Sequence, residues 1–171
     1  MDIDGFWKII EDVKKEGGID IEERTSVLEN QLEKLLTAEI ISFSNLFGEL
    51  VDSVYTWDLW GAAYVIQGGC SDDGFWDFRS SLVSTGRKTF ERAVSSPDSL
   101  AELESFEIQN LYFEGFQYVA QDVYEEITDE DMPIHERDRP TEPIGEDWDF
   151  DDRNEVKNRL PKLCDIFFND N

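Results

Sequence analysis

The sequence predicts an all-α fold, an irregular bundle of about eight short helices with a long acidic loop before the C-terminal helix. Apolar residues recur every three or four positions in most segments, and no segment keeps the alternation typical of a half-buried strand. Hydrophobic residues make up 40% of the 171-residue chain, which is enough for a core without a disulfide or a metal ion. We therefore expect a single helical domain over residues 1–171, with an irregular acidic segment at 128–150 inside it.

Three amphipathic helices are predicted in the first third of the chain. The first covers residues 5–15, with Asp4 as its N-cap, and the second starts after Asp20. The third follows Thr37, which we expect to cap it. This third helix has the clearest apolar face in the sequence, formed by Ile40, Phe43, Phe47, Leu50 and Val54.

The most apolar segment lies in the middle of the chain. Residues 57–66 are apolar on nearly every side, which predicts a helix at the centre of the bundle. A glycine pair ends it, and Ser71 is predicted to cap the next helix. Asp72 and Asp73 then lie in the first turn, where the helix dipole favours negative charge. The inner face of this helix is predicted to contain Phe75, Phe78 and Leu82.

Four further helical segments complete the prediction. They cover residues 87–94, 97–104 and about 108–127, and a final helix begins near Asp151 and is interrupted by Pro161. Their buried faces are expected to include Phe90, Val94, Tyr112, Phe116, Val119, Val123, Leu163, Ile166, Phe167 and Phe168.

Prolines and acids make residues 128–150 irregular, either draped over the bundle or mobile. Ile144 and Trp148 are the residues expected to fix this segment to the core.

The charge of the chain is its most unusual property. Forty acidic residues against 15 basic ones give a net charge of −25. Such a field repels nucleic acid and anionic membranes, so we expect neither to bind directly, and it attracts basic proteins. A solvated, soluble surface is the simpler explanation.

The cellular compartment is predicted from the absence of a membrane span and of a signal peptide. No apolar stretch approaches the length of a membrane span, and the acidic N-terminus does not resemble a signal peptide. We expect a cytoplasmic protein in which Cys70 and Cys164 are reduced.

Residues 68–74 combine glycines with acids and are the segment of the sequence that most suggests a local functional site. The two aspartates there would repel phosphate, so helix capping is favoured over anion binding. Cys70 would need a base to become a nucleophile, and the only histidine is His135, far away in the acidic segment. Asp72, Asp73 and Asp77 have oxygen ligands but not the spacing of a calcium loop, so no metal and no cofactor are predicted.

Arg79 has two interpretations. It forms a structural ion pair with Asp58 or with a glutamate of a neighbouring helix, or it is a recognition residue in a cleft. The cleft would be lined by Trp57, Trp60 and Trp76.

These residues form part of a long pattern. It comprises Tyr55, Trp57 to Tyr64, Gly68 to Phe75, Phe78-Arg79, Gly86-Arg87 and Pro97 to Leu100, with Phe6-Trp7, Tyr118 to Ala120, Tyr124 and Trp148. The pattern resembles a bacterial family, the domain-of-unknown-function family 4240, over nearly the whole chain. The resemblance implies a stand-alone helical domain and no known activity, substrate or cofactor. Ser81 departs from it, at a position where the family is expected to have tryptophan.

The resemblance marks a shared core, and a shared core can define the fold as readily as a function. Together with the acid pattern it gives a candidate functional cluster of Trp57, Asp58, Trp60, Cys70, Ser71, Asp72, Asp73, Asp77 and Arg79.

Three functions fit this sequence. The leading hypothesis is a non-enzymatic acidic protein that recognises a basic protein partner, as an immunity or inhibitor protein does. The alternative is a small-molecule-binding domain or enzyme with a cleft around Trp57, Trp60, Cys70, Asp72, Asp73 and Arg79. The third is a DNA mimic.

Overall fold

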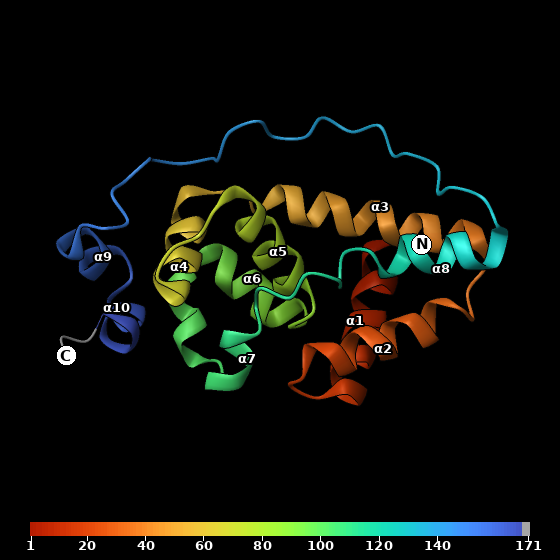
Figure 1. Ribbon diagram of the computed structural model, residues 1–171, viewed down its shortest axis with the longest axis horizontal. Coiled ribbons are helices and arrows are strands. Elements are labelled where there is room, and N and C mark those ends of the chain that lie inside the picture. Colours follow the sequence, from red (N-terminus) through yellow and green to blue (C-terminus); the bar gives the residue numbers. More distant parts are fainter. Residues whose placement is uncertain (169–171) are drawn as a thin grey trace.

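The computed structural model describes residues 1–168 and confirms the all-α class, since no strand occurs in that range. Figure 1 shows the helices in chain order. They are α1 (Ile3–Gly17), α2 (Ile21–Leu32), α3 (Thr37–Ser53), α4 (Trp57–Gln67), α5 (Asp72–Val83), α6 (Arg87–Ser95), the 3₁₀ helix η1 (Pro97–Glu102), α7 (Ser105–Gln109), α8 (Val119–Thr128), α9 (Arg153–Arg159) and α10 (Pro161–Phe167).

The helix starts follow the local capping chemistry. Helix α2 starts after Asp20, as predicted, and Asp20 caps it by accepting a hydrogen bond from the N–H of Glu22. The prediction for α1 was wrong by two residues: Asp2, and not Asp4, accepts from the N–H of Gly5 at 2.8 Å. Thr37 is the first residue of α3 and not its cap, a position that Leu36 takes.

Helix α4 packs between α5 on one side and α9 and α10 on the other, so it lies nearer the C-terminal end of the bundle than the expected centre (Figure 1). Leu59, Ala62 and Ala63 are buried, whereas the indoles of its two tryptophans are only half-buried. Gly61 lies where a Cβ would come within 2.1 Å of Trp148 Cζ2, so the absence of a side chain lets the indole of Trp148 pack on this helix.

The single helix expected over residues 108–127 was wrong. The chain turns between the end of α7 and the start of α8, and Gly115 adopts φ +151°, which L side chains rarely take. Phe116 is nevertheless buried, because the turns keep the apolar residues directed at the core. Apolar spacing alone therefore predicted burial correctly and the secondary structure incorrectly.

Three smaller expectations were also corrected. Val94 and Ile166 were expected to be buried but are about half exposed. The nearby residues Ala93 and Cys164 are buried instead. The segment expected as helix 97–104 is the 3₁₀ helix η1. Its residue Asp98 is buried and accepts hydrogen bonds from the N–H groups of residues 162 and 163, so it caps α10.

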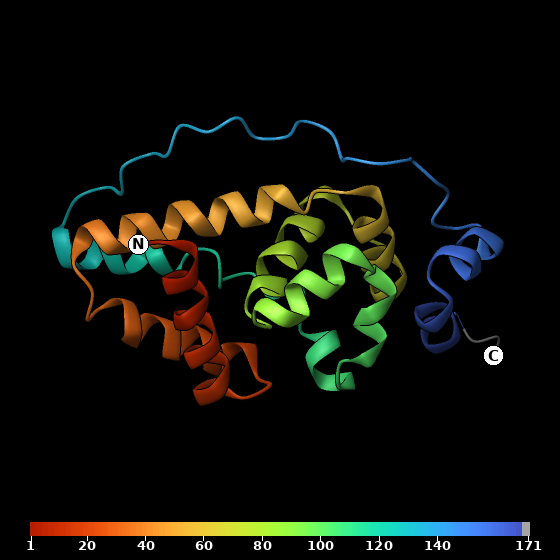
Figure 2. The same cartoon turned by 180° about the vertical axis from the view of Figure 1, so that it is seen from behind.

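The irregular acidic segment is confirmed, and it is attached to the bundle. We call residues 129–152 the strap. The strap follows α3 from α8 to α9 in both front and rear views (Figures 1 and 2). Arg137 Nε donates to Asp52 Oδ2 of α3 at 2.5 Å, and Ile144 exchanges backbone hydrogen bonds with the carbonyl of Tyr55 and the N–H of Trp57.

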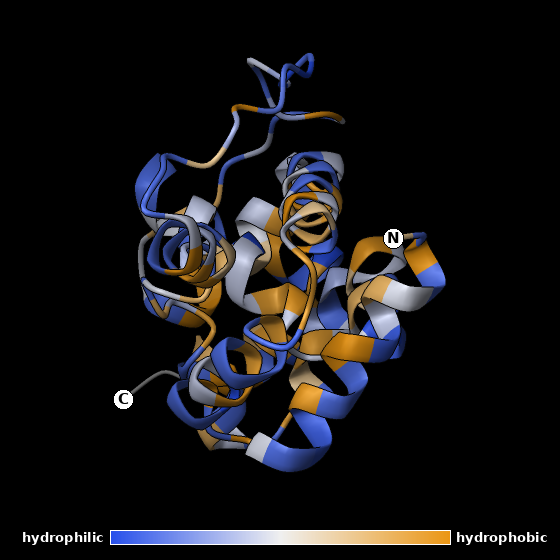
Figure 3. Ribbon diagram, turned by 90° about the vertical axis from the view of Figure 1, so that its right-hand side faces the viewer, coloured by the Kyte–Doolittle hydropathy of each residue, from blue (hydrophilic) through white to orange (hydrophobic). Residues whose placement is uncertain are grey.

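Colouring by hydropathy separates the strap from the core (Figure 3). The strap is mostly hydrophilic, whereas the helices carry many of the apolar residues that form the buried core. Trp148 fixes the strap through its buried indole, as predicted, whereas Ile144 does so through its backbone because its side chain is largely exposed.

No helix in residues 1–168 has both the length and the apolar character needed to cross a bilayer.

Candidate functional site

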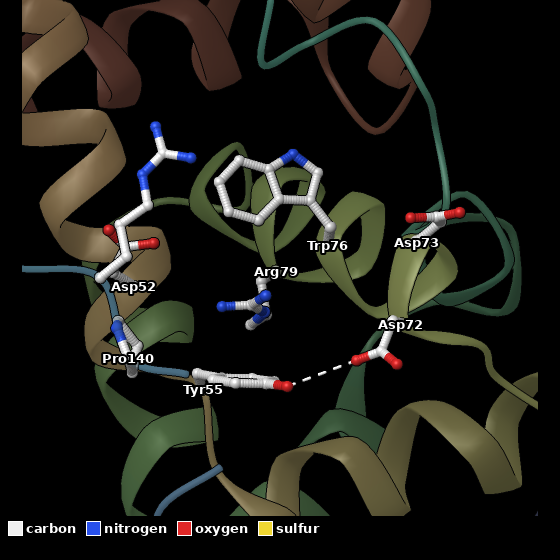
Figure 4. Close-up of a pocket in the computed structure, with 8 residues that line it drawn as sticks. Asp52, Tyr55, Asp72, Asp73, Trp76, Arg79 and Pro140 are labelled. Carbon is white, nitrogen blue, oxygen red and sulfur yellow. Dashed lines mark hydrogen bonds between the residues drawn. The ribbon is translucent and has the colours of Figure 1, made fainter. Parts of the chain in front are cut away.

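A pocket of about 250 Å³ lies where the end of α3, the first turns of α5 and the strap meet. Its lining combines charged and aromatic side chains from segments far apart in the sequence (Figure 4). The lining residues are Asp52, Tyr55, Asp72, Asp73, Trp76, Arg79, Arg139 and Pro140.

Arg79 is held rigidly in this pocket. Its side chain is only 5% exposed. Nη1 donates to the carbonyl of Val51 at 3.0 Å, and Nε donates to the carbonyl of Phe75 at 3.3 Å. Val51 is in the last turn of α3, so the guanidinium satisfies a carbonyl that the end of that helix leaves without a partner.

Aromatic rings cover the guanidinium of Arg79. Its Cζ lies 4.4 Å from the ring centroid of Tyr55 and 5.3 Å from that of Trp76. Figure 4 shows the guanidinium between these two side chains. Such stacking is favourable for a cation and restricts its rotation. The orientation of Arg79 is therefore fixed in the free protein.

Arg79 has no carboxylate partner among the described residues, so the expected ion pair with Asp58 was wrong. Asp58 instead contacts Arg159 and the indole N–H of Trp148. Burial lowers the pKa of Arg79 to about 10, and the charges of Asp52, Tyr55 and Asp72 offset this only in part. The group stays cationic at neutral pH, and its Nη2 makes no hydrogen bond within residues 1–168.

A second buried arginine, Arg24, has all of its nitrogens bonded within the protein and serves as a comparison for Arg79. Arg24 is 1% exposed, and its Nη2 contacts Glu107 Oε1 at 2.6 Å. Its other nitrogens donate to the carbonyl of Gly18 and to Ser84 Oγ. Every nitrogen of Arg24 is thus used inside the protein, in contrast to Arg79.

Asp72 and Asp73 lie on one side of the pocket. Ser71 caps α5, as predicted, by accepting a hydrogen bond from the N–H of Gly74. Asp72 accepts from the hydroxyl of Tyr55 at 3.3 Å, and both aspartates are exposed. Figure 4 shows them on one side of Arg79, with Asp52 and Pro140 on the other. The pocket therefore has a cation at its floor and carboxylates along one edge.

The family model described as Protein of unknown function (DUF4240) matches residues 1–126. The chain belongs to this family. The match confirms the resemblance and includes six of the eight pocket residues, while the likeness at Trp148 lies outside the matched range. No curated protein and no solved structure matches the chain significantly.

In this DUF4240 chain, the rest of the expected cluster serves the packing around α4. Trp57 and Trp60 stack on each other with ring centroids 5.5 Å apart, and neither lines the pocket. The indole N–H of Trp60 donates to the carbonyl of Cys70. Asp77 accepts from the amide of Gln117 at 2.8 Å, outside the pocket. The structure thus divides the cluster and keeps only Asp72, Asp73 and Arg79 together with Trp76.

Ser81 is fully buried, and its hydroxyl donates to the carbonyl of Phe113 at 3.3 Å. It does not line the pocket, so the departure expected at this position would leave the pocket lining unchanged.

Sequence reasoning missed half of the pocket. Asp52 is a buried acid on the apolar side of α3, which was a signal that the spacing argument did not use. Tyr55 was part of the family pattern but had no assigned role. Arg139 and Pro140 come from the strap, whose path over the bundle cannot be read from local spacing.

Cys70 does not form the cysteine–histidine pair considered from the sequence. His135 contacts Glu49 Oε1 at 3.1 Å instead. Burial raises the pKa of the Cys70 thiol to about 11, against smaller opposing effects of hydrogen bonds with Tyr112 and Trp60. The thiol is therefore protonated near neutral pH and is a poor nucleophile.

Alkylation tests this state of Cys70. At pH 8, iodoacetamide should modify Cys70 in the folded protein about 100-fold more slowly than in urea, because the thiolate fraction falls tenfold for each unit of pKa. Peptide mass spectrometry over time gives the rate. Equal rates in the folded and unfolded protein would contradict the raised pKa.

The aspartates considered for a cation do not gather. Within residues 1–168, the one group of three or more potential ligand residues close enough to share an ion is Glu29, Glu33 and Glu126, whose oxygens lie within 4.8 Å of one another. Glu29 lies in α2, Glu33 directly follows that helix and Glu126 lies in α8, and all three are exposed.

Proposed function

We propose that this protein is a non-enzymatic binding protein whose pocket holds the anionic group of a small ligand on Arg79. One observation carries the proposal: Arg79 is buried, has no carboxylate partner among the described residues and has a terminal nitrogen free of protein hydrogen bonds. Burying a charge costs several kcal/mol unless it is paired. The fold gives this cation two backbone carbonyls but no opposite charge, and an anionic ligand would supply the missing charge partner.

The geometry also suits recognition. The guanidinium is held by two backbone carbonyls and two aromatic rings, so little conformational entropy is lost when a ligand binds. Arginine matches carboxylate and phosphate groups with paired N–H donors. The volume of about 250 Å³ lies at the small end of ligand sites, which favours a compact ligand.

Ligand-induced stabilisation tests the proposal. We expect at least one member of a panel of small carboxylates and amino acids to raise the Tm of the wild type, by mass action on the folded state. Arg79→Met should abolish this increase. The matched control is Arg87→Met, which removes the same charge from an exposed arginine paired with Asp4 and Glu91 and should keep it.

Two results would refute the proposal. One is a panel in which no compound changes the Tm, and the other is an equal increase in the Arg79→Met variant.

A second candidate function, recognition of a basic protein, is supported by the carboxylates of Glu29, Glu33 and Glu126. Three like charges within 4.8 Å repel one another, and a lysine or arginine of a partner would relieve that repulsion. Leu36 is 73% exposed in the connection that follows α2, at the end of the molecule where α8 also ends (Figure 1). A basic partner with an apolar residue fits this surface. We also propose that the protein is bacterial and cytoplasmic, a compartment in which free thiols such as those of Cys70 and Cys164 stay reduced.

Charge-neutral variants test the second candidate. A triple variant Glu29→Gln, Glu33→Gln and Glu126→Gln should weaken binding of a lysine-rich peptide containing leucine by about tenfold at 0.15 M salt, since one lost charge-assisted contact has that size. The control, with the same charge change, is Glu16→Gln, Glu23→Gln and Glu104→Gln, all exposed. Equal weakening by both triples would show non-specific attraction only.

A further inference from the structure

We propose that the ligand of the Arg79 pocket is a zwitterion of amino-acid size, with its anionic group on Arg79 and its ammonium group on Asp72 and Asp73. This inference rests on the proposed binding function and adds the chemical class of the ligand.

The carboxylates of the pocket differ in how far the protein satisfies them. Asp52 contacts Arg137 at 2.5 Å and is only 9% exposed. Asp72 accepts one hydrogen bond, from the hydroxyl of Tyr55, and Asp73 accepts none from the described residues. A carboxylate accepts several hydrogen bonds, so Asp72 and Asp73 keep unused acceptor capacity at the pocket edge.

The cations of the pocket lie close together, around the ring of Trp76. Arg79 and Arg139 both approach the ring of Trp76, with their Cζ atoms 5.3 Å and 5.9 Å from its centroid. Once Asp52 and Arg137 are taken as a pair, two guanidinium groups and two carboxylates remain in and around the cavity. The remaining positive and negative charges are therefore equal in number, and the guanidinium groups are separated in space from the carboxylates.

This separation selects against ligands of one sign. A phosphate or dicarboxylate bound to Arg79 would lie near Asp72 and Asp73, and the net charge of −25 would also repel it. A simple amine would face two guanidinium groups. A ligand with one charge of each sign satisfies both ends, because opposite charges close together in a partly buried site attract strongly.

The apolar part of the pocket wall determines the size and polarity of the uncharged part of the ligand. Tyr55, Trp76 and Pro140 give the cavity flat apolar surfaces between its charged ends. The strap supplies Pro140 and Arg139 and is tied down on both sides of them, by Arg137 and by the backbone of Ile144. The cavity is therefore shaped for a short ligand with a compact apolar substituent.

Matched analogues on one carbon skeleton test the inference. The standard amino acids are first screened by thermal shift, and the best binder is compared by calorimetry with its deaminated acid, its decarboxylated amine and its N-acetyl derivative. We expect the amino acid to bind at least about tenfold more tightly than each analogue, since each analogue lacks one charge-assisted hydrogen bond.

Variants assign the two ends of the ligand. Asp72→Asn with Asp73→Asn should weaken binding of the amino acid about tenfold and leave binding of the deaminated acid unchanged or stronger. Ser71 still caps α5 in this variant, so the helix is kept. The control is Asp77→Asn, which changes an acid of the same helix outside the pocket.

The outcomes separate the inference from the proposed function. Equal affinity of the deaminated acid and the amino acid would overturn the zwitterion and leave anion binding at Arg79 standing. Absence of binding by every amino acid and every deaminated acid would overturn both.

Discussion

Replacing Arg24 with methionine should lower the free energy of unfolding by about 3–5 kcal/mol, because it removes one partner of a buried ion pair. Glu107 is 7% exposed and would keep a charge without its partner at 2.6 Å. The carbonyl of Gly18 would also lose its hydrogen bond from Arg24 Nε. Urea denaturation followed by tryptophan fluorescence measures the change.

A double variant provides the control. Arg24→Met with Glu107→Met removes both charges and should recover most of the lost free energy of unfolding. A loss below about 1 kcal/mol in the single variant would show that the pair contributes little.

Replacing Arg79 with methionine should have a different effect: loss of ligand binding with little or no loss of stability. Methionine fills a similar volume and removes an unpaired buried charge, which stabilises the fold. The hydrogen bonds to the carbonyls of Val51 and Phe75 and the stacking on Tyr55 and Trp76 are also lost, at a cost of about 1 kcal/mol each. Removal of the unpaired charge, worth several kcal/mol, offsets these losses. We therefore expect an unfolding free energy within about 1 kcal/mol of the wild type, or higher, in the same urea experiment.

The two buried arginines thus give opposite predictions from one substitution. A loss of about 3 kcal/mol or more on Arg79→Met, equal to that of Arg24→Met, would show that Arg79 serves the fold. Equal stability combined with lost binding would show that it is kept for the ligand.

Local chemistry made part of this fold predictable. Asp20 and Ser71 cap helices through their own side chains, and Gly68 ends α4 in the left-handed region, so sequence neighbours alone determine these positions. The helix predicted across Gly115 failed because the apolar spacing there arises from turns that pack against the core. In this segment periodicity indicated correctly that Phe116, Val119 and Val123 are buried, whereas tertiary packing decides the backbone path.

Only the part of the pocket formed by α5 was predictable from the sequence. Asp72, Asp73 and Arg79 are on one helix, and their unusual grouping was visible in the sequence. Arg139 reaches the pocket only because the strap is tied to α3 and to the start of α4, which is a long-range arrangement. Trp57 and Trp60 were misassigned to the cleft, since aromatic residues at helical spacing look the same whether they line a cavity or stack on each other.

Arginine side-chain NMR tests the central claim most directly. In wild-type protein labelled with ¹⁵N-arginine, the Nε and Nη signals of Arg79 are followed while the best ligand of the panel is added, with the signals of Arg24 as an internal reference. We predict that the Arg79 signals shift as ligand is added and that rotation about the Cζ–Nη2 bond of Arg79 slows, because Nη2 gains a partner. The signals of Arg24 should not change. Binding that leaves the Arg79 signals unchanged would contradict a ligand site at this residue.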